Sequence, residues 1–290
     1  MLLRSVLITP GNNMRMIVKS LTLNVDAGVL DLEDSVPMAD KETARIFIRD
    51  SIGTVKPEGS SLFVRVNGMT TGMVDEDLKY VVKKGLDGIM QPKSESKQDI
   101  IELDKLIEKY EKKEGLKIGS LKIIATFETA KGILNAYEIA TASKRVIAVG
   151  FGAVDYTRDL GTTISKEGSE LFYPRSHVAI VARATGVIPI DTVWIDIIDK
   201  EGLTKDANFS KQLGLKGKFL IHPNQIDVVN EVYSPKKSEV DYAGRVVKAF
   251  EEGASMGLGA VSLDGRMIDI AVYRQAQDLL NLANEIAKKK

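Results

Sequence analysis

Short apolar segments rich in β-branched residues recur along the chain, separated by longer segments with helical periodicity. In segments 99–113 and 130–142, apolar residues stand three and four positions apart, as in an amphipathic helix that covers a sheet. Strands that alternate with helices predict a parallel sheet. Eight strands are predicted, at Ser5–Thr9, Gly28–Leu32, Ser61–Val66, Asp87–Gln91, Leu121–Phe127, Val146–Phe151, Thr192–Ile197 and Lys218–Ile221.

Eight strand–helix units favour a closed barrel over an open dinucleotide-binding sheet. The open sheet carries Gly-x-Gly-x-x-Gly after its first strand, whereas this first turn reads Pro-Gly-Asn-Asn. We therefore predict an α/β fold, a (β/α)8 TIM barrel with a C-terminal helical extension. The barrel catalytic domain is assigned to 1–224 and the extension to 225–290. In the extension we expect a helix near 239–253, a short strand and turn at 260–269, and a final helix.

Composition excludes several classes of function. The 40 basic and 40 acidic residues cancel, so the chain offers no broad positive field to nucleic acid or an anionic membrane. No apolar stretch approaches the ~20 residues that span a bilayer, and the first ten residues are too short for a secretion signal. The absence of cysteine removes disulfides, thiolate metal sites and cysteine nucleophiles. We expect a cytoplasmic protein without nucleic-acid or membrane partners.

Polar residues follow nearly every predicted strand, where a parallel barrel carries its functional side chains. Carboxylates that converge on one mouth repel each other unless a cation neutralises them, and oxygen ligands favour Mg²⁺ or Mn²⁺ over zinc. We predict Glu128 and Asp155 as direct metal ligands. The alternative for each is that it caps the helix that follows it.

Arg65 interrupts an otherwise apolar strand, so its guanidinium must reach a partner or the barrel mouth. Its planar fork suits a substrate carboxylate, and the alternative is an internal salt bridge to Asp31 or Glu33. Alternation along the strand puts Asp31 and Glu33 on one face and Asp34 on the other. This pattern leaves open which of Asp31 and Glu33 faces the ion.

The two histidines do not indicate a particular active site, and the common catalytic motifs are not found in their expected contexts. His222 follows the eighth strand, where a general base and a ring hydrogen-bonded at the rim remain alternatives, while His177 in a predicted helix suits a structural role. The chain contains no P-loop or His-Glu-x-x-His motif, and its one Gly-x-Ser-x-Gly match, at 253–257, follows a predicted helix and not a strand, so it is no nucleophile elbow. A serine hydrolase, a kinase and a zincin are therefore disfavoured.

Several longer motifs stand in order over essentially the whole chain. They are RSVLITPGN (4–12), LDLEDSV (30–36) with Lys41 and Ala44-Arg45, RVN (65–67), QPK (91–93), FETAKGILNAYEIA (127–140), GFGAVDYTRDLG (150–161) and GRMID (265–269). By these motifs the chain resembles the citrate lyase β-subunit family, which is similar to the malyl-CoA and citramalyl-CoA lyases.

The resemblance implies a Mg²⁺-dependent carbon–carbon lyase that cleaves a citryl, citramalyl or malyl thioester of CoA or an acyl carrier into an acetyl thioester and a 2-oxo acid. It places the metal ligands on Glu128 and Asp155 and the carboxylate-binding arginine on Arg65. It also implies that Asp269 is an acid/base that reaches a neighbouring subunit. From the residues alone, Asp269 would instead cap the last helix.

Further candidates complete this site. Glu33 joins Arg65 and Asp269 as catalytic, and Asp34 and Lys93 join Arg65 in substrate binding. Arg15 and Lys19, one turn apart at a helix start, are candidates for coenzyme phosphates. The resemblance implies a homo-oligomer, trimer or hexamer, and partner subunits of a citrate lyase complex.

Three alternatives remain open. They are a malate-synthase-like thioesterase, a class II aldolase acting on free 2-oxo acids, and a non-catalytic subunit of a lyase complex. Joint presence of Glu128, Asp155 and Arg65 argues against the last, because a scaffold requires none of them. The sequence does not select the acyl thioester, nor CoA over an acyl carrier.

Overall fold

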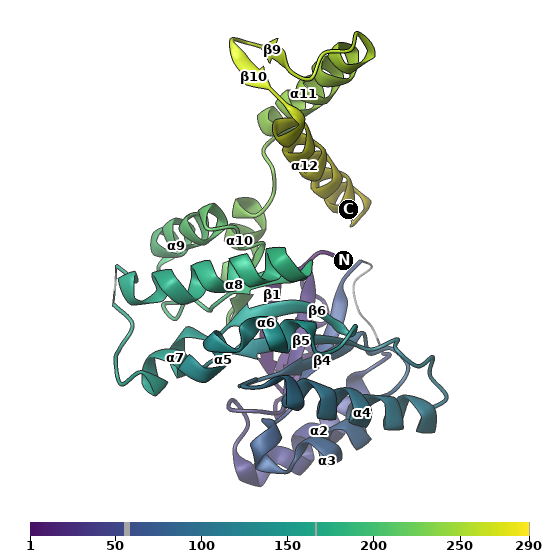
Figure 1. Cartoon of the computed structure of the whole chain (residues 1–290). Coiled ribbons are helices and arrows are strands. Elements are labelled where there is room, and N and C mark those ends of the chain that lie inside the picture. Colours follow the sequence, from purple (N-terminus) through teal and green to yellow (C-terminus); the bar gives the residue numbers. More distant parts are fainter. Residues whose placement is uncertain (55–58, 166, 290) are drawn as a thin grey trace. The chain divides into compact units, whose positions relative to one another are not determined.

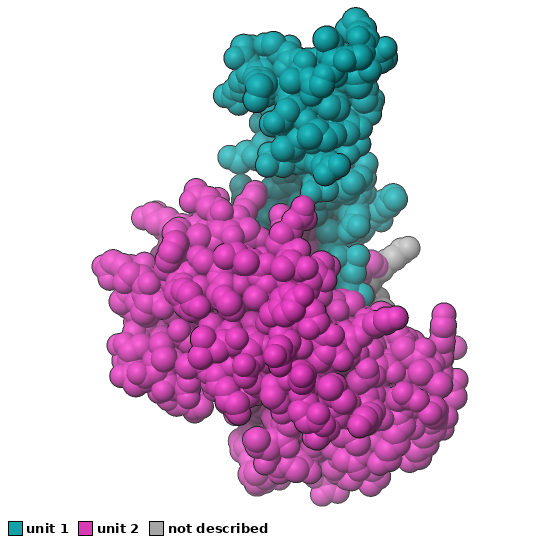
Figure 2. Space-filling view, viewed as in Figure 1, with its two compact units in different colours: residues 1–2, 231–290 teal, residues 3–230 magenta. Residues whose placement is uncertain are grey.

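The computed structural model describes residues 1–54, 59–165 and 167–289. The chain divides into two compact units, Leu3–Asn230 and a second that joins Met1–Leu2 to Glu231–Lys290 (Figure 2). We call them the barrel unit and the C-terminal unit.

Eight parallel strands close into a barrel, in which each strand pairs with its neighbours in chain order and β1 pairs with β8 (Figure 1). The predicted TIM barrel is therefore confirmed. The strands are β1 (Ser5–Pro10), β2 (Ala27–Asp31), β3 (Ser61–Arg65), β4 (Gly88–Gln91), β5 (Lys122–Phe127), β6 (Val146–Phe151), β7 (Ile188–Asp191) and β8 (Gly217–Leu220).

The seventh strand was predicted in the wrong place. It was expected at Thr192–Ile197, but β7 ends at Asp191 and the predicted segment forms the loop that follows it. In that loop Ile195 is 57% exposed and Ile197 is 41% exposed, so the apolar run is not a buried strand. The true strand contains Pro189, which cannot donate a hydrogen bond, although its carbonyl accepts one from the Lys216 N–H at 2.9 Å.

The helices follow the strands and cover the outside of the barrel (Figure 1). The segment predicted as one helix at 130–142 forms two short helices that meet at Asn135. No helix in the described ranges is long and apolar enough to cross a membrane. The helices of this part are α1 (Met14–Ser20), η1 (Met38–Asp40), α2 (Lys41–Ser51), η2 (Met69–Thr71), α3 (Val74–Val81), α4 (Lys97–Lys113), α5 (Ala130–Leu134), α6 (Ala136–Thr141), α7 (Ala153–Asp159), η3 (Ser169–Leu171), α8 (Phe172–Thr185), α9 (Lys200–Gln212), η4 (Pro223–Gln225) and α10 (Ile226–Val232).

Two apolar layers stabilise the barrel unit. One lies between the strands and the helices, and the other fills the barrel interior. Successive strand residues point to opposite faces, so alternate residues of each strand belong to the inner layer. That inner layer includes Val6, Ala27, Val29, Phe63, Met90, Ile124, Ala148, Ile190 and Phe219.

The C-terminal unit has its own small core. It consists of α11 (Lys237–Ser255), the antiparallel pair β9 (Val261–Leu263) and β10 (Arg266–Ile268), and α12 (Ile270–Lys289). Asp264 and Gly265 link the two strands with φ of 51° and 76°, as a tight two-residue hairpin requires. The elements predicted for this segment are therefore present.

Candidate functional site

The inward register of the strands carries polar side chains to the barrel mouth. Val29 and Phe63 belong to the inner apolar layer, and two residues later stand Asp31 and Arg65. On β5, Ile124 belongs to the same layer, and the same alternation leads to Glu128 just after the strand. Local strand geometry therefore brings an arginine and two carboxylates to one end of the barrel.

Arg65 is largely buried, with 14% of its side chain exposed, and is held by two acids. Its Nε and Nη2 donate to the two carboxylate oxygens of Asp31, both at 2.7 Å, and its Nη1 lies 3.2 Å from Glu33 Oε2. Burial by itself disfavours the charge, but Asp31 and Glu33 outweigh it and raise the pKa of Arg65 above its usual value. Burial likewise acts to raise the pKa of Asp31, and Arg65 reverses this so that the pKa is lowered. The internal salt bridge that was an alternative for Arg65 is thus present.

Lys93 extends this network across the mouth. Its ammonium lies 2.6 Å from Glu33 Oε1 and 2.7 Å from Asp34 Oδ2. Burial opposes the charge, but the hydrogen bonds to Asp34 and Glu33 raise the pKa of Lys93. Its φ of 48° lies in the left-handed region, a conformation that non-glycine residues adopt rarely and often at functional sites.

Lys41 supports the loop after β2. It is buried, and its ammonium donates to the carbonyls of Leu32 and Glu33 and to Asn67 Oδ1. Burial lowers the pKa of Lys41 although four acids oppose the shift. Lys41 belongs to the motifs that carry the family resemblance, but the sequence does not indicate its role, because the contacts that hold its ammonium come from residues 8 to 26 positions away.

Glu128 is buried in an environment that disfavours its charge. Burial and the charge of Glu33 raise the pKa of Glu128 to about 7, with a smaller contribution from Asp155, whereas Arg65 and a 2.6 Å hydrogen bond from Thr126 Oγ1 oppose the shift. Glu128 does not cap the following helix, because the Thr129 hydroxyl does so by accepting from Gly132 N–H.

Asp155 stands in the first turn of α7 and makes no capping hydrogen bond there, since the cap residue of that helix is Gly152. Its Oδ1 lies 2.8 Å from Nη2 of Arg158, three residues later. Gly152 also makes room for Glu128, because a Cβ at this position would lie 2.6 Å from Glu128 Cγ. The start of α7 therefore carries one carboxylate, and its cap residue makes room for the other.

Both carboxylates line a cavity of about 530 Å³, which we call the mouth cavity. Its other walls are mainly apolar side chains and glycine. The polar residues that line it are Asp34, Ser35, Arg65, Glu128, Asp155, Arg158 and Thr192.

The mouth cavity fits a hard divalent cation held by two protein ligands. In the described residues no group of three or more His, Cys, Asp or Glu side chains could hold a metal ion. Mg²⁺ commonly takes one or two carboxylates and leaves its other positions to water and substrate oxygens. Burial, Glu33 and Asp155 disfavour the negative charge of Glu128. A bound cation would stabilise that charge.

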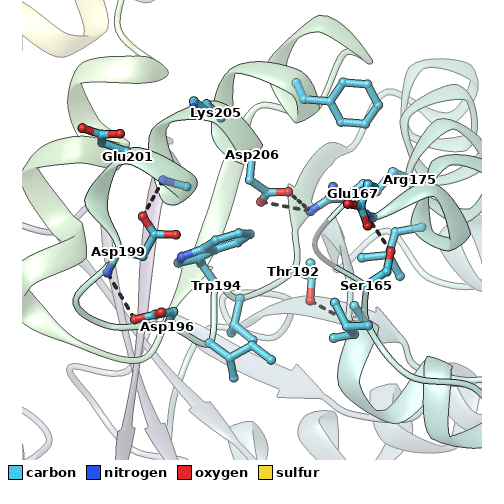
Figure 3. Close-up of a pocket in the computed structure, with 18 residues that line it drawn as sticks. Ser165, Glu167, Arg175, Thr192, Trp194, Asp196, Asp199, Glu201, Lys205 and Asp206 are labelled. Atoms are coloured by element: carbon cyan, nitrogen blue, oxygen red, sulfur yellow. Dashed lines mark hydrogen bonds and ion pairs between the residues drawn. The ribbon is translucent and has the colours of Figure 1, made fainter.

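A second cavity of about 880 Å³, the side cavity, lies under the loop between β7 and α9 (Figure 3). It shares Ala153, Thr192 and Val193 with the mouth cavity. The Thr192 hydroxyl accepts a 2.9 Å hydrogen bond from Ala153 N–H and so joins the start of α7 to the end of β7. Acidic side chains dominate its charged lining, namely Glu167, Asp196, Asp199, Glu201 and Asp206.

Neither histidine lines these two cavities. His222 Nδ1 accepts a 3.2 Å hydrogen bond from Asn224 N–H, which agrees with the interpretation of a ring held at the rim. The ring of His177 stacks on Tyr173 with centroids 5.7 Å apart, a structural contact.

Three further candidates lie outside the mouth cavity, on α1 and just before α12. Asp269 Oδ1 accepts from Ala271 N–H and Val272 N–H, both at 3.0 Å, and so caps α12 within the C-terminal unit. Arg15 and Lys19 are exposed on α1, where Met16 lines the mouth cavity. Neither cation forms a salt bridge with the part of the chain that the structure describes.

Known proteins resemble the chain over nearly its full length. Residues 4–223 match the HpcH/HpaI aldolase/citrate lyase family. The chain is 39% identical to citrate lyase subunit beta of Leuconostoc mesenteroides subsp. cremoris, over 97% of this chain and 93% of the relative. It is 34% identical to the mitochondrial citramalyl-CoA lyase of Homo sapiens, over 99% of this chain and 87% of the relative.

A solved structure shows the same similarity. CitE of Mycobacterium tuberculosis, in complex with magnesium, acetoacetate and coenzyme A, is 30% identical and covers 97% of this chain and 98% of its own, with a TM-score of 0.78. The resemblance to the citrate lyase β-subunit family and the prediction of a lyase are confirmed by these relatives. The chain belongs to the HpcH/HpaI aldolase/citrate lyase family.

Proposed function

We propose that the protein is a Mg²⁺-dependent carbon–carbon lyase. It cleaves a 3-hydroxy-3-carboxy acyl thioester into an acetyl thioester and a 2-oxo acid. The observation that carries this proposal is that Glu128, Asp155 and Arg65 line one cavity at the barrel mouth. The relatives named citrate lyase subunit beta and citramalyl-CoA lyase support it, as does the magnesium in the M. tuberculosis structure.

Glu128 and Asp155 would hold the Mg²⁺ ion, or Mn²⁺ in its place. When bound, it polarises oxygen atoms of the 2-oxo acid portion and stabilises the negative charge that develops there. Two carboxylate ligands suffice, because substrate oxygens and water fill the remaining positions.

Arg65 would hold the carboxylate beside the reacting carbon. Its guanidinium is fixed by Asp31 and Glu33 before substrate arrives, so little reorganisation accompanies binding. Glu33 contacts Arg65 and Lys93 but does not line the mouth cavity, so we assign it a positioning role. Asp34 lines the cavity and is held by Lys93, and we retain both as candidates for substrate binding.

In cleavage, the hydroxyl of the substrate gives its proton to water as the carbon–carbon bond breaks, and the methylene carbon of the acetyl fragment gains a proton. We assign this second proton transfer to Asp269 of a neighbouring subunit. Asp269 Oδ1 is engaged in capping α12, and Oδ2 is the oxygen we assign to the proton. This arrangement requires a homo-oligomer, which we propose to be a trimer or hexamer.

We propose CoA as the thioester carrier, with Arg15 and Lys19 binding its phosphates. Both cations lie on α1, the helix whose Met16 lines the mouth cavity. The side cavity is a poorer place for phosphates, since its lining contains more acids than bases. An acyl-carrier thioester and partner subunits of a citrate lyase complex are the related alternative.

The first test measures acetyl-CoA formation from citryl-, citramalyl- and malyl-CoA, with Mg²⁺ and after its removal by a chelator. We expect metal-dependent cleavage of at least one thioester, reduced more than about 100-fold in Glu128→Gln, since even residues that only support metal ligands commonly contribute 10- to 100-fold. Glu76→Gln, which removes an exposed acid paired with Lys79, is the matched control.

Other products would favour the alternatives. Release of free citrate or malate with CoA indicates a thioesterase. Cleavage of free hydroxy acids without a thioester indicates an aldolase. Thioester cleavage that is unaffected by chelation or by Glu128→Gln contradicts the proposed mechanism, and absence of all cleavage contradicts the lyase.

A further inference from the structure

We propose that Arg158 binds a second carboxylate of the 2-oxo acid, so that the protein prefers a dicarboxylic 2-oxo acid such as oxaloacetate and therefore a citryl thioester. This inference rests on the proposed function. The three candidate thioesters differ at one substituent of the reacting carbon, which is a carboxymethyl group in citryl, a methyl group in citramalyl and hydrogen in malyl. A carboxylate removed from water requires a cation or several donors, whereas a methyl group or hydrogen requires neither.

Two cationic side chains line the mouth cavity among the described residues, Arg65 and Arg158. Arg65 is the candidate for the carboxylate beside the ketone. Lys93 does not line the cavity, and its ammonium is already held by Glu33 and Asp34. Arg158 is therefore the cation that remains for a second carboxylate.

The guanidinium of Arg158 is accessible and lightly held. Its side chain is 74% exposed, and within the described chain its salt bridge is a single contact from Nη2 to Asp155 Oδ1, at 2.8 Å. An arginine has five N–H donors, so Nε and Nη1 remain for a carboxylate. Arg65, by contrast, has a side chain that is only 14% exposed and engages Asp31 and Glu33 through all three of its guanidinium nitrogens.

Asp155, the partner of Arg158, places this arginine near the reacting end of the substrate. Asp155 is one of the two proposed metal ligands, and Arg158 stands three residues later on the same face of α7. A carboxylate oxygen that faces a divalent cation holds an arginine less strongly, because the two positive charges compete for it. Arg158 would then be free to turn toward a bound 2-oxo acid beside Asp155.

The other residues that line the mouth cavity are unsuited to a second carboxylate. Pro10, Met16, Phe219 and Ile221 offer no charge, and the acids Asp34, Glu128 and Asp155 would repel a second carboxylate. A cavity that served only a methyl group or hydrogen would need no second arginine at this position.

The test compares Arg158→Gln and Arg158→Lys with the wild type, with Arg49→Gln as a matched control. Arg49 is also an exposed arginine paired with one nearby aspartate, Asp50, and it lies on α2. Calorimetry on the Mg²⁺-loaded protein measures the dissociation constants of oxaloacetate and pyruvate. Kinetics measure kcat/KM for citryl-CoA and citramalyl-CoA.

In Arg158→Gln we expect oxaloacetate binding and citryl-CoA cleavage to weaken at least about tenfold, the loss of a charge-assisted hydrogen bond. The dissociation constant of pyruvate should change by less than about twofold. Arg158→Lys should recover part of the oxaloacetate affinity, and Arg49→Gln should match the wild type. The affinity for Mg²⁺ should be retained in all variants.

Three outcomes overturn the inference. If oxaloacetate and pyruvate binding change equally, or neither changes, while the wild type cleaves thioesters, Arg158 does not select a carboxylate and the proposed function stands. If Mg²⁺ affinity falls in parallel, Arg158 acts only through Asp155. If the wild type cleaves no thioester with Mg²⁺, the proposed function fails and this inference fails with it.

Discussion

The charge and position of one buried carboxyl group, that of Glu128, depend on individual residues around the mouth cavity. Burial and neighbouring acids raise its pKa to about 7, so the charged form needed for metal binding is costly without a cation. Its position also depends on the missing side chain at Gly152. At this scale, one methyl group is enough to disturb the site.

We predict that Gly152→Ala weakens Mg²⁺ binding by about 10- to 100-fold, the usual effect of disturbing the support of a metal ligand. The added Cβ would lie 2.6 Å from Glu128 Cγ, too close for either atom to keep its place. Isothermal titration calorimetry with Mg²⁺ measures the effect. Gly28→Ala on β2 is the control, since its Cβ would meet nothing nearer than Leu62 Cδ1 at 3.9 Å. Equal Mg²⁺ affinity in Gly152→Ala and wild type would show that this contact does not matter.

At the scale of elements, a buried cluster of four charges joins the two strands and two helices beside the side cavity. Arg175 of α8 and Lys218 of β8 both contact Asp191 of β7 and Asp206 of α9 (Figure 3 shows the Arg175–Asp206 pair). Burial acts to raise the pKa of Asp206, but Lys218 and Arg175 outweigh it and lower the pKa. Each charge in the cluster therefore depends on the others.

We predict that Asp206→Asn lowers the free energy of unfolding by about 3–5 kcal/mol at neutral pH, the cost of removing one partner from a buried ion pair. Because the pKa of Asp206 is lowered from 3.8 in the folded protein, its contribution is present above pH 3.8 and is lost as pH falls through the native pKa. Urea unfolding at neutral pH and below pH 3.8 should therefore show a difference from wild type that shrinks in acid.

The control for this prediction is Asp50→Asn, which removes an acid that is paired with Arg49 and whose side chain is 52% exposed. Surface substitutions usually change stability little, so this variant should unfold like the wild type. A difference for Asp206→Asn that is independent of pH would mean that lost packing, and not lost charge, accounts for its instability.

At the scale of the whole molecule, the proposed catalytic groups belong to two different units. Glu128, Asp155 and Arg65 lie in the barrel unit, and Asp269 lies in the C-terminal unit. If a complete site combines the barrel of one subunit with Asp269 of another, two inactive variants can restore each other.

We predict that Asp269→Asn and Glu128→Gln are each inactive alone. When the two variants are unfolded together and refolded as mixed oligomers, about a quarter of wild-type activity should return. Random assembly places an intact Glu128 beside an intact Asp269 of a neighbouring subunit in about a quarter of the sites. Asparagine keeps the N-cap of α12, so stability should be retained in the first variant. Thioester cleavage and light scattering measure the result. Each variant refolded alone is the control, and no recovery in verified mixed oligomers would indicate a site formed within one chain.

Much of the architecture was predictable because strand and helix periodicity are local properties. Alternation in the segments that became β2 and β3 correctly put Asp31 and Arg65 at the strand ends. The seventh strand was missed because composition does not report burial: Ile195, Ile197 and Ile198 are exposed, and the proline within β7 resembles a strand breaker. Thr192 was missed as a site residue because it was placed inside the predicted strand, whereas it directly follows β7.

The sequence by itself determined the barrel, the candidate metal ligands and the candidate carboxylate-binding arginine, because these depend on spacing along one strand and on motifs of a few residues. Only the tertiary structure decided which partners those residues have. Arg65 meets Asp31 across 34 residues, Lys93 meets Glu33 across 60, and Thr192 meets Ala153 across 39. Assembly of the strands into the barrel creates these contacts, and burial then shifts the pKa values of the charged groups, since both depend on what surrounds a side chain in three dimensions.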